Sequence, residues 1–328
     1  MPLNNNQRMN LLLQHIVMCL GFAAALAPAH AAGAAPCTPP AAVRDIDANS
    51  YYKDGQHAVV DPELRERNIA ATQALDDYLD AVAGRASAYG SRGDVAGGRC
   101  ALVWLTAWAD GHAMLGKMAS AQSYHQRKWT LAGLALSYAR VRPLADGAQR
   151  DAIDGWLRTL ADATIAHADA HKGPRNNHYY WEGLAVAAVG AVTRDARQLD
   201  WSRAVFASAM EQIGDDGALP RELARGPRAL LYHAFSAAPL TMLASILDVH
   251  APRLDRLVRY TVAGANDASA IAKAAGAPQQ PLSRQAMAWL PVYGRHAGKR
   301  DLLPGNGASY PRLGGALGTA NPLEHVHP

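Results

Sequence analysis

The sequence of 328 residues contains little cysteine and no run of lysine or arginine. Charged residues make up 18% of the chain, and the formal net charge is +4. A basic surplus that is this small and this dispersed does not indicate a nucleic-acid-binding protein. Beyond the N-terminal region no stretch is long and apolar enough to span a bilayer, so we expect no membrane anchor.

The sequence also lacks the residue groups of metal sites and of glycoside hydrolases. His325 and His327 stand near the C-terminus, but two ligands at a frayed end are too few for zinc. Neither polar stretch described below supplies the pair of neighbouring carboxylates that a hydrolase uses. We therefore expect no metal and no cofactor, and we predict that residues 316–328 form a flexible tail.

The first 31 residues have the pattern of a secretory signal peptide. Arg8 precedes the apolar run 11–27, and Ala29-His30-Ala31 forms a small-x-small cleavage site. The pattern predicts a periplasmic or secreted protein whose basic surplus suits an acidic polysaccharide. Removal of Cys19 with this peptide leaves Cys37 and Cys100 in an oxidising compartment, where either one disulfide or two free buried thiols would account for them.

Apolar residues recur at helical spacing wherever a period can be read, and no convincing alternating strand appears. Asp61-Pro62-Glu63 is a start signal for one such segment, and further segments are predicted at 100–116, 124–141, 181–193, 200–213, 227–249 and 254–263. Several of them are alanine-rich on every face, as in "GLAVAAVGAV", which is typical of a helix that is packed on both sides. We predict one domain, 32–315, built from two layers of helices.

Two polar stretches are candidates for a site. In "NNHYYW" (176–181), the two asparagines can cap a helix that begins near His178, and a helix N-terminus stabilises anions. In "LPRELARGPRALLYHAF" (219–235), Arg228, Tyr232 and Phe235 fall at i, i+4 and i+7 on one helix face. Taken alone, the first stretch is equally well explained as an ordinary N-cap followed by core aromatics. The second is equally well explained as a solvated arginine near a buried tyrosine.

Both stretches, with "RCALVWLTAWA" (99–109), "QRKW" (126–129), "AWLPVY" (288–293) and "PRLGG" (311–315), occur in the order and roughly the spacing of one known family. The sequence resembles the alginate lyases of polysaccharide lyase family 5 over roughly 37–315. The resemblance implies an all-α fold, an incomplete (α/α) toroid in which helical hairpins surround a deep cleft. It also implies β-elimination in alginate or other polyuronates, leaving a 4,5-unsaturated uronate, by an enzyme that we expect to be a monomer.

The resemblance assigns roles to four positions. Asn177 and Arg228 match residues that neutralise the substrate carboxylate, which is necessary because the neighbouring negative charge makes the C5 proton weakly acidic. His178 matches an imidazole that takes this proton or joins the neutralisation. The family's proton donor is a tyrosine seven residues after the arginine, and Phe235 stands there instead.

Phenylalanine keeps the ring but cannot give or take a proton, and three explanations remain open. A native tyrosine has been replaced by phenylalanine to trap the substrate, or Tyr232 or Tyr179 supplies the phenol, or the lineage has evolved into a protein that binds uronans without cleaving them. A non-catalytic uronan-binding or export-assisting protein is therefore the alternative function.

The remaining candidates are substrate-binding residues. Tyr51 stands where the family usually has a lysine and Lys53 follows two residues later, which puts the substrate preference in doubt. We predict that further cationic and aromatic residues line the cleft, although residues of these types are equally often surface charges or core aromatics. These candidates are Arg127, Trp129, Tyr179, Tyr180, Trp181, His233 and Arg312.

Overall fold

The computed structural model describes residues 37–171, 173, 175–299 and 308–318. The predicted signal peptide and residues 319–328 of the predicted tail lie outside the described residues. From Cys37 onward the chain forms one unit. Its described part is mostly helical, as the sequence predicts.

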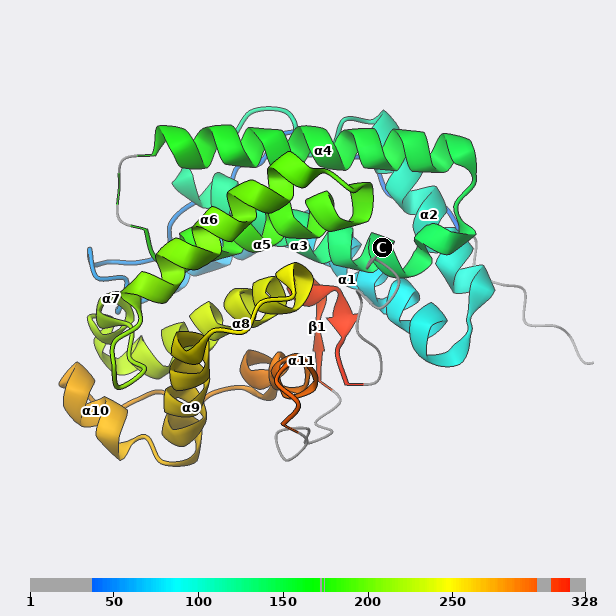
Figure 1. The fold of residues 1–328 in the computed structure, drawn as a ribbon. Helices are drawn as coiled ribbons and strands as arrows, with labels where there is room; N and C mark the ends of the chain where they lie inside the picture. Colours follow the sequence, from blue (N-terminus) through cyan, green and yellow to red (C-terminus); the bar gives the residue numbers. More distant parts are fainter. Residues whose placement is uncertain (1–36, 172, 174, 300–307, 319–328) are drawn as a thin grey trace, which may run out of the picture. The chain divides into compact units, whose positions relative to one another are not determined.

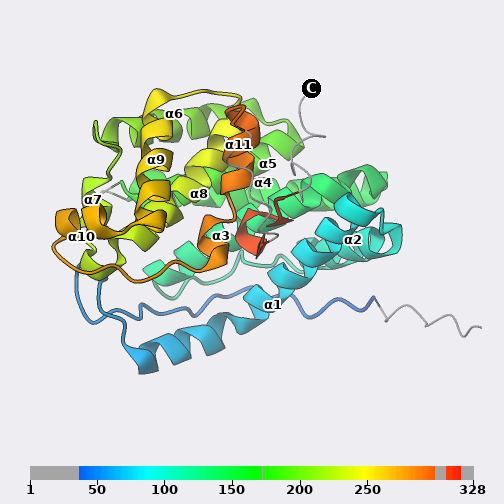
Figure 2. The same ribbon diagram turned by 90° about the horizontal axis from the view of Figure 1, so that it is seen from below.

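The N-terminal part of the unit is a trio of packed helices, α1 (Pro62–Arg92), α2 (Val95–Asp110) and α3 (Ala121–Val141). The carboxylate of Asp61 caps α1 by accepting the Leu64 N–H at 3.0 Å, as its position before a proline indicates. Segment 37–60 runs alongside α1 (Figure 2). Cys37 and Cys100 are disulfide-bonded with their Cα atoms 5.5 Å apart, so the start of this segment is fixed to α2, and the predicted disulfide is confirmed.

The helices that follow along the chain pack around a central helix, α5. α5 (Asn177–Thr193) contacts α3, α4 (Gly147–Ala170), α6 (Ala196–Gln212) and α8 (Ala229–Leu247), with α4 above it and α8 below it in Figure 1. Nearly every residue of α3, α5 and α8 is buried, whereas α4, α6 and α9 (Pro252–Asn266) bury one face. The predicted two layers are therefore present, and the architecture is the (α/α) toroid.

The other elements are short. They are the helices α7 (Pro220–Leu223), α10 (Ser269–Ala275) and α11 (Leu290–His296), the 3-10 turns Arg142–Leu144, Gly226–Arg228, Arg284–Met287 and Pro311–Leu313, and the strands β1 (Ser309–Tyr310) and β2 (Gly315–Ala316). The expectation that no stretch beyond the N-terminal region is long and apolar enough to span a bilayer was wrong, because within the described ranges the helical stretch Gly226–Leu247 meets that criterion. However, 89% of its apolar window is buried inside the protein. Burial of this kind is typical of the core helix of a folded domain.

A small hairpin near the C-terminus corrects two predictions. β1 pairs antiparallel with β2, so the expectation of no strand was wrong. Leu317 is only 1% exposed, which shows that the domain continues past the predicted boundary at residue 315. Gly133 on α3 makes the close approach of this segment possible, because a Cβ there would lie 2.3 Å from the carbonyl oxygen of Pro311. Arg312 is thereby held against α3.

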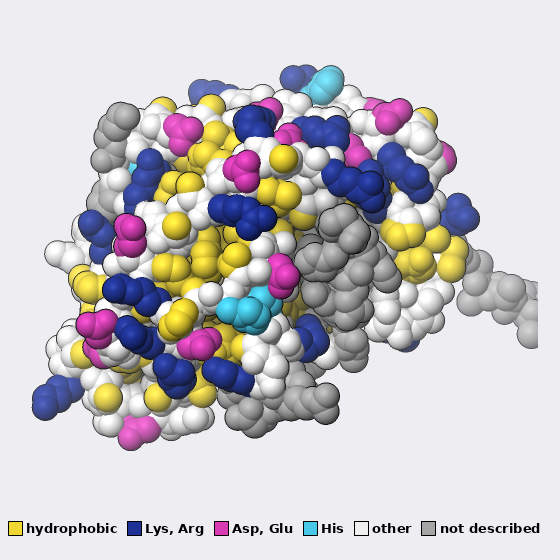
Figure 3. All heavy atoms as spheres, in the orientation of Figure 1, with side chains coloured by type: hydrophobic (Ala, Val, Ile, Leu, Met, Phe, Trp, Pro, Cys, Tyr) yellow, Lys and Arg dark blue, Asp and Glu magenta, His cyan; other side chains and the backbone are white. Residues whose placement is uncertain are grey.

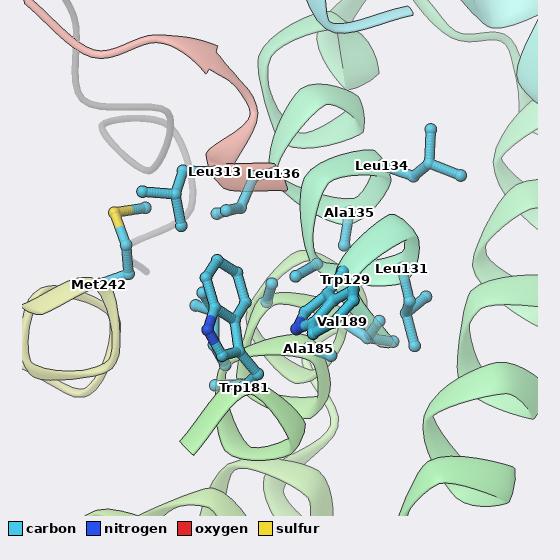
Figure 4. Close-up of a cluster of buried hydrophobic side chains, with 14 of the residues drawn as sticks. Trp129, Leu131, Leu134, Ala135, Leu136, Trp181, Ala185, Val189, Met242 and Leu313 are labelled. Carbon is cyan, nitrogen blue, oxygen red and sulfur yellow. The ribbon is translucent and has the colours of Figure 1, made fainter. Parts of the chain in front are cut away.

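The core that supports the site lies between α3, α5 and α8. Figure 4 shows Trp129 of α3 and Trp181 of α5 side by side, while Leu313 of the hairpin meets Leu136 and Met242. Trp181 is fully buried and Trp129 is 5% exposed. Both indoles are thus fixed by packing, so the residues around them have little freedom to move.

Candidate active site

A cavity of about 290 Å³ brings both polar stretches together. Segment 37–60, the start of α3, the start of α5, the first two turns of α8 and the hairpin all contribute side chains to it. Its lining consists of Ser50, Tyr51, Tyr52, His57, Ala121, Gln122, His125, Trp129, His178, Arg228, Leu231, Tyr232, Phe235 and Arg312. Residues that are far apart in sequence therefore share one cavity of mixed aromatic, cationic and imidazole character.

His178 enters the cavity from the first turn of α5. Asn176 caps this helix by accepting the His178 N–H at 3.0 Å, which confirms the predicted N-cap. The imidazole lies flat against that of His125 from α3, with ring centroids 3.6 Å apart and planes 7° apart. Both Nδ1 atoms are buried without a hydrogen-bond partner among the described residues.

Both stacked imidazoles are held neutral. Burial lowers the pKa of His178 well below its usual value, and the nearby His125 and the Lys128 ammonium lower it further. Burial, together with Lys128, lowers the pKa of His125 to about 2. A neutral imidazole retains a lone pair, which is the form that can accept a proton.

The cation beside the histidines belongs to a buried ion pair. Lys128 Nζ lies 2.8 Å from Glu182 Oε1, and their side chains are 1% and 9% exposed. Burial lowers the pKa of Lys128 while Glu182 opposes that shift. The pair joins α3 to α5, and its ammonium is near enough to the imidazoles to lower the pKa of both.

Arg228, at the N-cap of α8, is tied to two phenols. Its Nη1 donates to the Tyr52 hydroxyl at 2.7 Å, and that hydroxyl is hydrogen-bonded to the Tyr232 hydroxyl at 2.7 Å. The Nε–H of Arg228 has no partner among the described residues. Burial raises the pKa of Tyr52 to about 12 and raises that of Tyr232, so both phenols are protonated at neutral pH.

Phe235 places a bare ring beside these groups. Its ring meets Trp129 edge-on at 5.7 Å and lies 5.1 Å from Trp181, whose Nε1–H donates to the Phe235 carbonyl at 3.1 Å. The predicted face of Arg228, Tyr232 and Phe235 is confirmed as one face of the cavity.

Arg312 and Trp129 line the cavity beside Phe235. The guanidinium lies 4.3 Å above the indole, in a cation–π contact. Both residues, with Tyr51 and Gln122, also line an adjoining pocket of about 180 Å³. The groove thus continues past the indole, which suits a ligand longer than one sugar.

Asn177 does not face the cavity. It is fully buried, and its Nδ2 donates to Glu222 Oε1 at 2.9 Å, the oxygen that also accepts the Asn177 backbone N–H at 3.3 Å. Glu222 is held in turn by Arg225, whose Nε lies 3.3 Å from Oε2. The predicted anion site at the start of α5 is therefore occupied by the protein's own carboxylate, and a direct contact of Asn177 with substrate is not what this structure shows.

Three further candidates lie outside the cavity because of helix geometry. Since successive residues rotate by about 100° around a helix, positions two apart point to nearly opposite sides. Arg127 lies two residues from Trp129, and its Nη2 donates to the Ala163 carbonyl. Tyr180, two residues from His178, reaches Gln212 instead. His233 is fully buried and bonds the backbone of Leu219 and Ala229.

The last three predicted ligand contacts also lie elsewhere. Tyr179 packs on Arg175 and Trp201, and Trp181 supports Phe235 from the core. The side chain of Lys53 is 56% exposed and pairs with Asp61 at 3.5 Å. Tyr51, Trp129 and Arg312 are the predicted binding residues that do line the cavity.

Tyr52 and His125 are cavity residues that the sequence reasoning missed. His125 precedes Trp129 by four residues on α3, so helical spacing could have placed both on one face. Tyr52 adjoins Tyr51, and nothing in its local sequence shows that it would meet α8. Across the described ranges, no group of three or more His, Cys, Asp or Glu side chains is placed to hold a metal ion.

Charge on the surface is mixed. On the face shown in Figure 3, lysine and arginine side chains are interspersed with aspartate and glutamate over the helices and do not form one basic patch. The cationic character relevant to an anionic ligand is therefore that of the cavity, where Arg228 and Arg312 both contribute.

Comparison with known proteins agrees with this geometry. The sequence model of the family "Alginate lyase" matches residues 45–277. A polysaccharide lyase of Stenotrophomonas maltophilia (strain K279a) is 41% identical over 307 residues, covering 89% of this chain and 92% of that protein. An alginate lyase of Pseudomonas fluorescens (strain Pf-5) is 32% identical over 59% of this chain and 57% of its own length.

Solved structures show the same fold. Alginate lyase A1-III from Sphingomonas species A1 superposes with a TM-score of 0.70 at 23% identity, covering 90% of this chain and 86% of that one. A tyrosine-to-phenylalanine variant of that enzyme, complexed with a tetrasaccharide, has a TM-score of 0.74 at 23% identity, with 89% and 87% covered. By the family match and the Stenotrophomonas relative, this chain belongs to the alginate lyase family of polysaccharide lyases.

Proposed function

We propose that this protein is an exported lyase that cleaves mannuronate-rich alginate, and other polyuronates such as glucuronan and hyaluronan-like chains, by β-elimination. The observation that carries the proposal is that a neutral imidazole, His178, and a guanidinium, Arg228, line one cavity in a member of this family. The disulfide supports export, because such bonds persist in oxidising compartments. We propose a monomer as the working form.

The cavity supplies what the first step of elimination requires. Loss of the C5 proton places negative charge next to a carboxylate, so that carboxylate must be neutralised. Arg228 and Arg312 both line the cavity, and the Nε–H of Arg228 has no partner among the described residues. Guanidinium groups suit this task because their fork of donors matches both carboxylate oxygens.

His178 is the base in this proposal. In the free enzyme its depressed pKa makes it neutral but weakly basic. A bound uronate carboxylate would raise that pKa, because an opposite charge nearby favours the imidazolium form. The substrate thereby increases the basicity of the group that attacks it.

Tyr51 supports the broader substrate range. It lines the cavity where the resemblance places a lysine, and burial raises its pKa to about 12, so it presents a neutral hydroxyl. A neutral hydroxyl makes weaker demands on the position of a charged group than an ammonium does. The 41%-identical relative carries the name polysaccharide lyase, which is broader than alginate lyase.

Product absorbance tests the proposal. Polymannuronate, polyguluronate and polyglucuronate are each incubated with the protein, and the conjugated C4=C5 bond of the product is followed over time. We expect absorbance to rise fastest with polymannuronate, and His178→Ala to abolish the rise. A fully active His178→Ala variant would refute the assignment of the base.

A binder without turnover is the second candidate, favoured by Phe235. In alginate lyase A1-III a tyrosine-to-phenylalanine variant was obtained with a tetrasaccharide bound, so loss of one phenol there is compatible with binding. A flat absorbance trace for both the natural chain and Phe235→Tyr, with binding retained, would establish this alternative.

A further inference from the structure

We infer that the hydrogen-bonded pair Tyr52–Tyr232, held by Arg228, is the general acid that protonates the leaving O4 in place of the phenol absent at position 235. The inference rests on the proposed elimination reaction. It assigns a chemical role to Tyr52, which no sequence motif indicates, and it makes Tyr232 its partner.

The location of the phenols supports the assignment. Three tyrosines line the cavity, Tyr51, Tyr52 and Tyr232, whereas Tyr179 packs against Arg175 outside it. Tyr232 lies one turn before Phe235 on α8, with ring centroids 6.3 Å apart. A hydroxyl is therefore present one helical turn from the position where the family has its proton donor.

The hydrogen bonds around the pair stabilise the product of proton transfer. The two hydroxyls carry two protons, and the bond between them uses one, which leaves the other for a ligand. When that proton leaves, the phenolate oxygen retains a hydrogen bond from the other hydroxyl. The Arg228 Nη1 that donates to Tyr52 adds a positive charge 2.7 Å away. A second cation, Arg225, lies 4.5 Å from the Tyr232 ring centre.

In the complete elimination, every proton and electron pair that moves has a named acceptor. His178 takes the C5 proton, and the C5–H electron pair becomes the C4=C5 bond. The C4–O4 bond breaks with its electrons on O4, and the tyrosine pair supplies the proton that O4 requires. Solvent then takes the proton from the imidazolium and returns one to the phenolate, so the enzyme is regenerated.

The test compares two substrates that differ only in their need for an acid. Polymannuronate has a sugar leaving group that requires a proton, whereas a methyl uronoside with a dinitrophenyl ether at C4 releases a phenolate that requires none. We expect Tyr52→Phe and Tyr232→Phe each to lower kcat on polymannuronate by roughly 30-fold or more, since a positioned acid contributes about 10²–10⁴. Elimination from the aryl ether should change less than about 3-fold, because its leaving group makes no use of general acid catalysis.

Further variants separate chemistry from structure. The double variant should be about as slow as either single one, because groups that act as a unit are not additive. Phe235→Tyr, made in the Tyr232→Phe background, should restore at least ~10-fold of the rate that Tyr232→Phe loses. Tyr89→Phe, which removes a phenol outside the cavity, is the matched control and should keep its activity.

The outcomes are separable. Equal loss on both substrates, or no loss on polymannuronate, would overturn the assignment of the acid while leaving the lyase function intact. A natural enzyme that eliminates only the aryl ether would show a base without an acid, which also overturns it. A natural enzyme inactive on both substrates would refute the proposed function itself, and the acid with it.

Discussion

Removing one partner of the buried pair Lys128–Glu182 should lower the free energy of unfolding strongly, whereas replacing both partners by apolar residues should lower it little. In Glu182→Gln the Lys128 ammonium, 1% exposed, can keep an amide oxygen as acceptor but loses the negative charge that compensates its own. Removing one partner of a buried pair costs about 3–5 kcal/mol, because the other charge stays buried without compensation. That is a large share of a typical unfolding free energy of about 5–15 kcal/mol.

Urea unfolding at neutral pH, followed by far-UV circular dichroism, measures this cost. The double variant Lys128→Met/Glu182→Leu removes both charges, so it should recover most of the loss and unfold within about 1–2 kcal/mol of the natural protein. Arg256→Ala is the control, since it breaks the exposed pair with Asp215 and should leave the unfolding free energy nearly unchanged.

The same pair should also set the pH dependence of catalysis. The charge of Lys128 lowers the pKa of His178, so Lys128→Met should raise that pKa and shift the acid limb of the kcat/KM profile to higher pH. A loss below about 1 kcal/mol for Glu182→Gln, or a double variant as unstable as the sum of the singles, would refute the energetic reasoning. An unmoved acid limb in Lys128→Met would refute the electrostatic part.

Three further predictions concern stability and the groove. The pKa of His125 is lowered to about 2 in the folded protein, so below the ordinary histidine pKa of ~6.5 the unfolded chain binds more protons than the folded one. The urea midpoint should therefore fall as the pH decreases below about 6.5, and it should fall less steeply in His125→Gln. Gly133→Ala should weaken binding of uronate oligomers in calorimetry, because a Cβ 2.3 Å from the Pro311 carbonyl would displace Arg312; unchanged affinity would contradict this. Reduction, or Cys100→Ser, should cost about 2–5 kcal/mol in urea unfolding, and an equal midpoint with and without reductant would contradict the expected role of the bridge.

Features encoded within a few residues could be predicted from the sequence. The Asp61 and Asn176 caps and the helical period of α1 and α8 are local, and the structure has them where they were expected. The hairpin at Ser309–Ala316 was missed because its two-residue strands are too short to show alternation, and it depends on close approach to Gly133.

Long-range pairing explains the errors at the site. Asn177 was expected to bind an anion, and it does hydrogen-bond a carboxylate, but that carboxylate is Glu222, 45 residues along the chain. The chemistry of the amide was inferred from its type and its position at a helix start, whereas the identity of its partner depends on the fold. The prediction for Lys53 was wrong for a local reason, because its ammonium pairs with Asp61, eight residues along the chain, and its side chain is 56% exposed.

Phe235 shows that the residue at one motif position does not by itself decide whether the site can donate a proton. Within α8 the family's proton donor is missing at position 235, and Tyr232, one turn earlier, is the phenol that the helix retains. Tyr52 stands 180 residues from Tyr232 along the chain, yet their hydroxyls lie 2.7 Å apart beside Arg228. The capacity to donate a proton is therefore a property of the whole cavity, and a substitution at one wall can be compensated by a side chain from another.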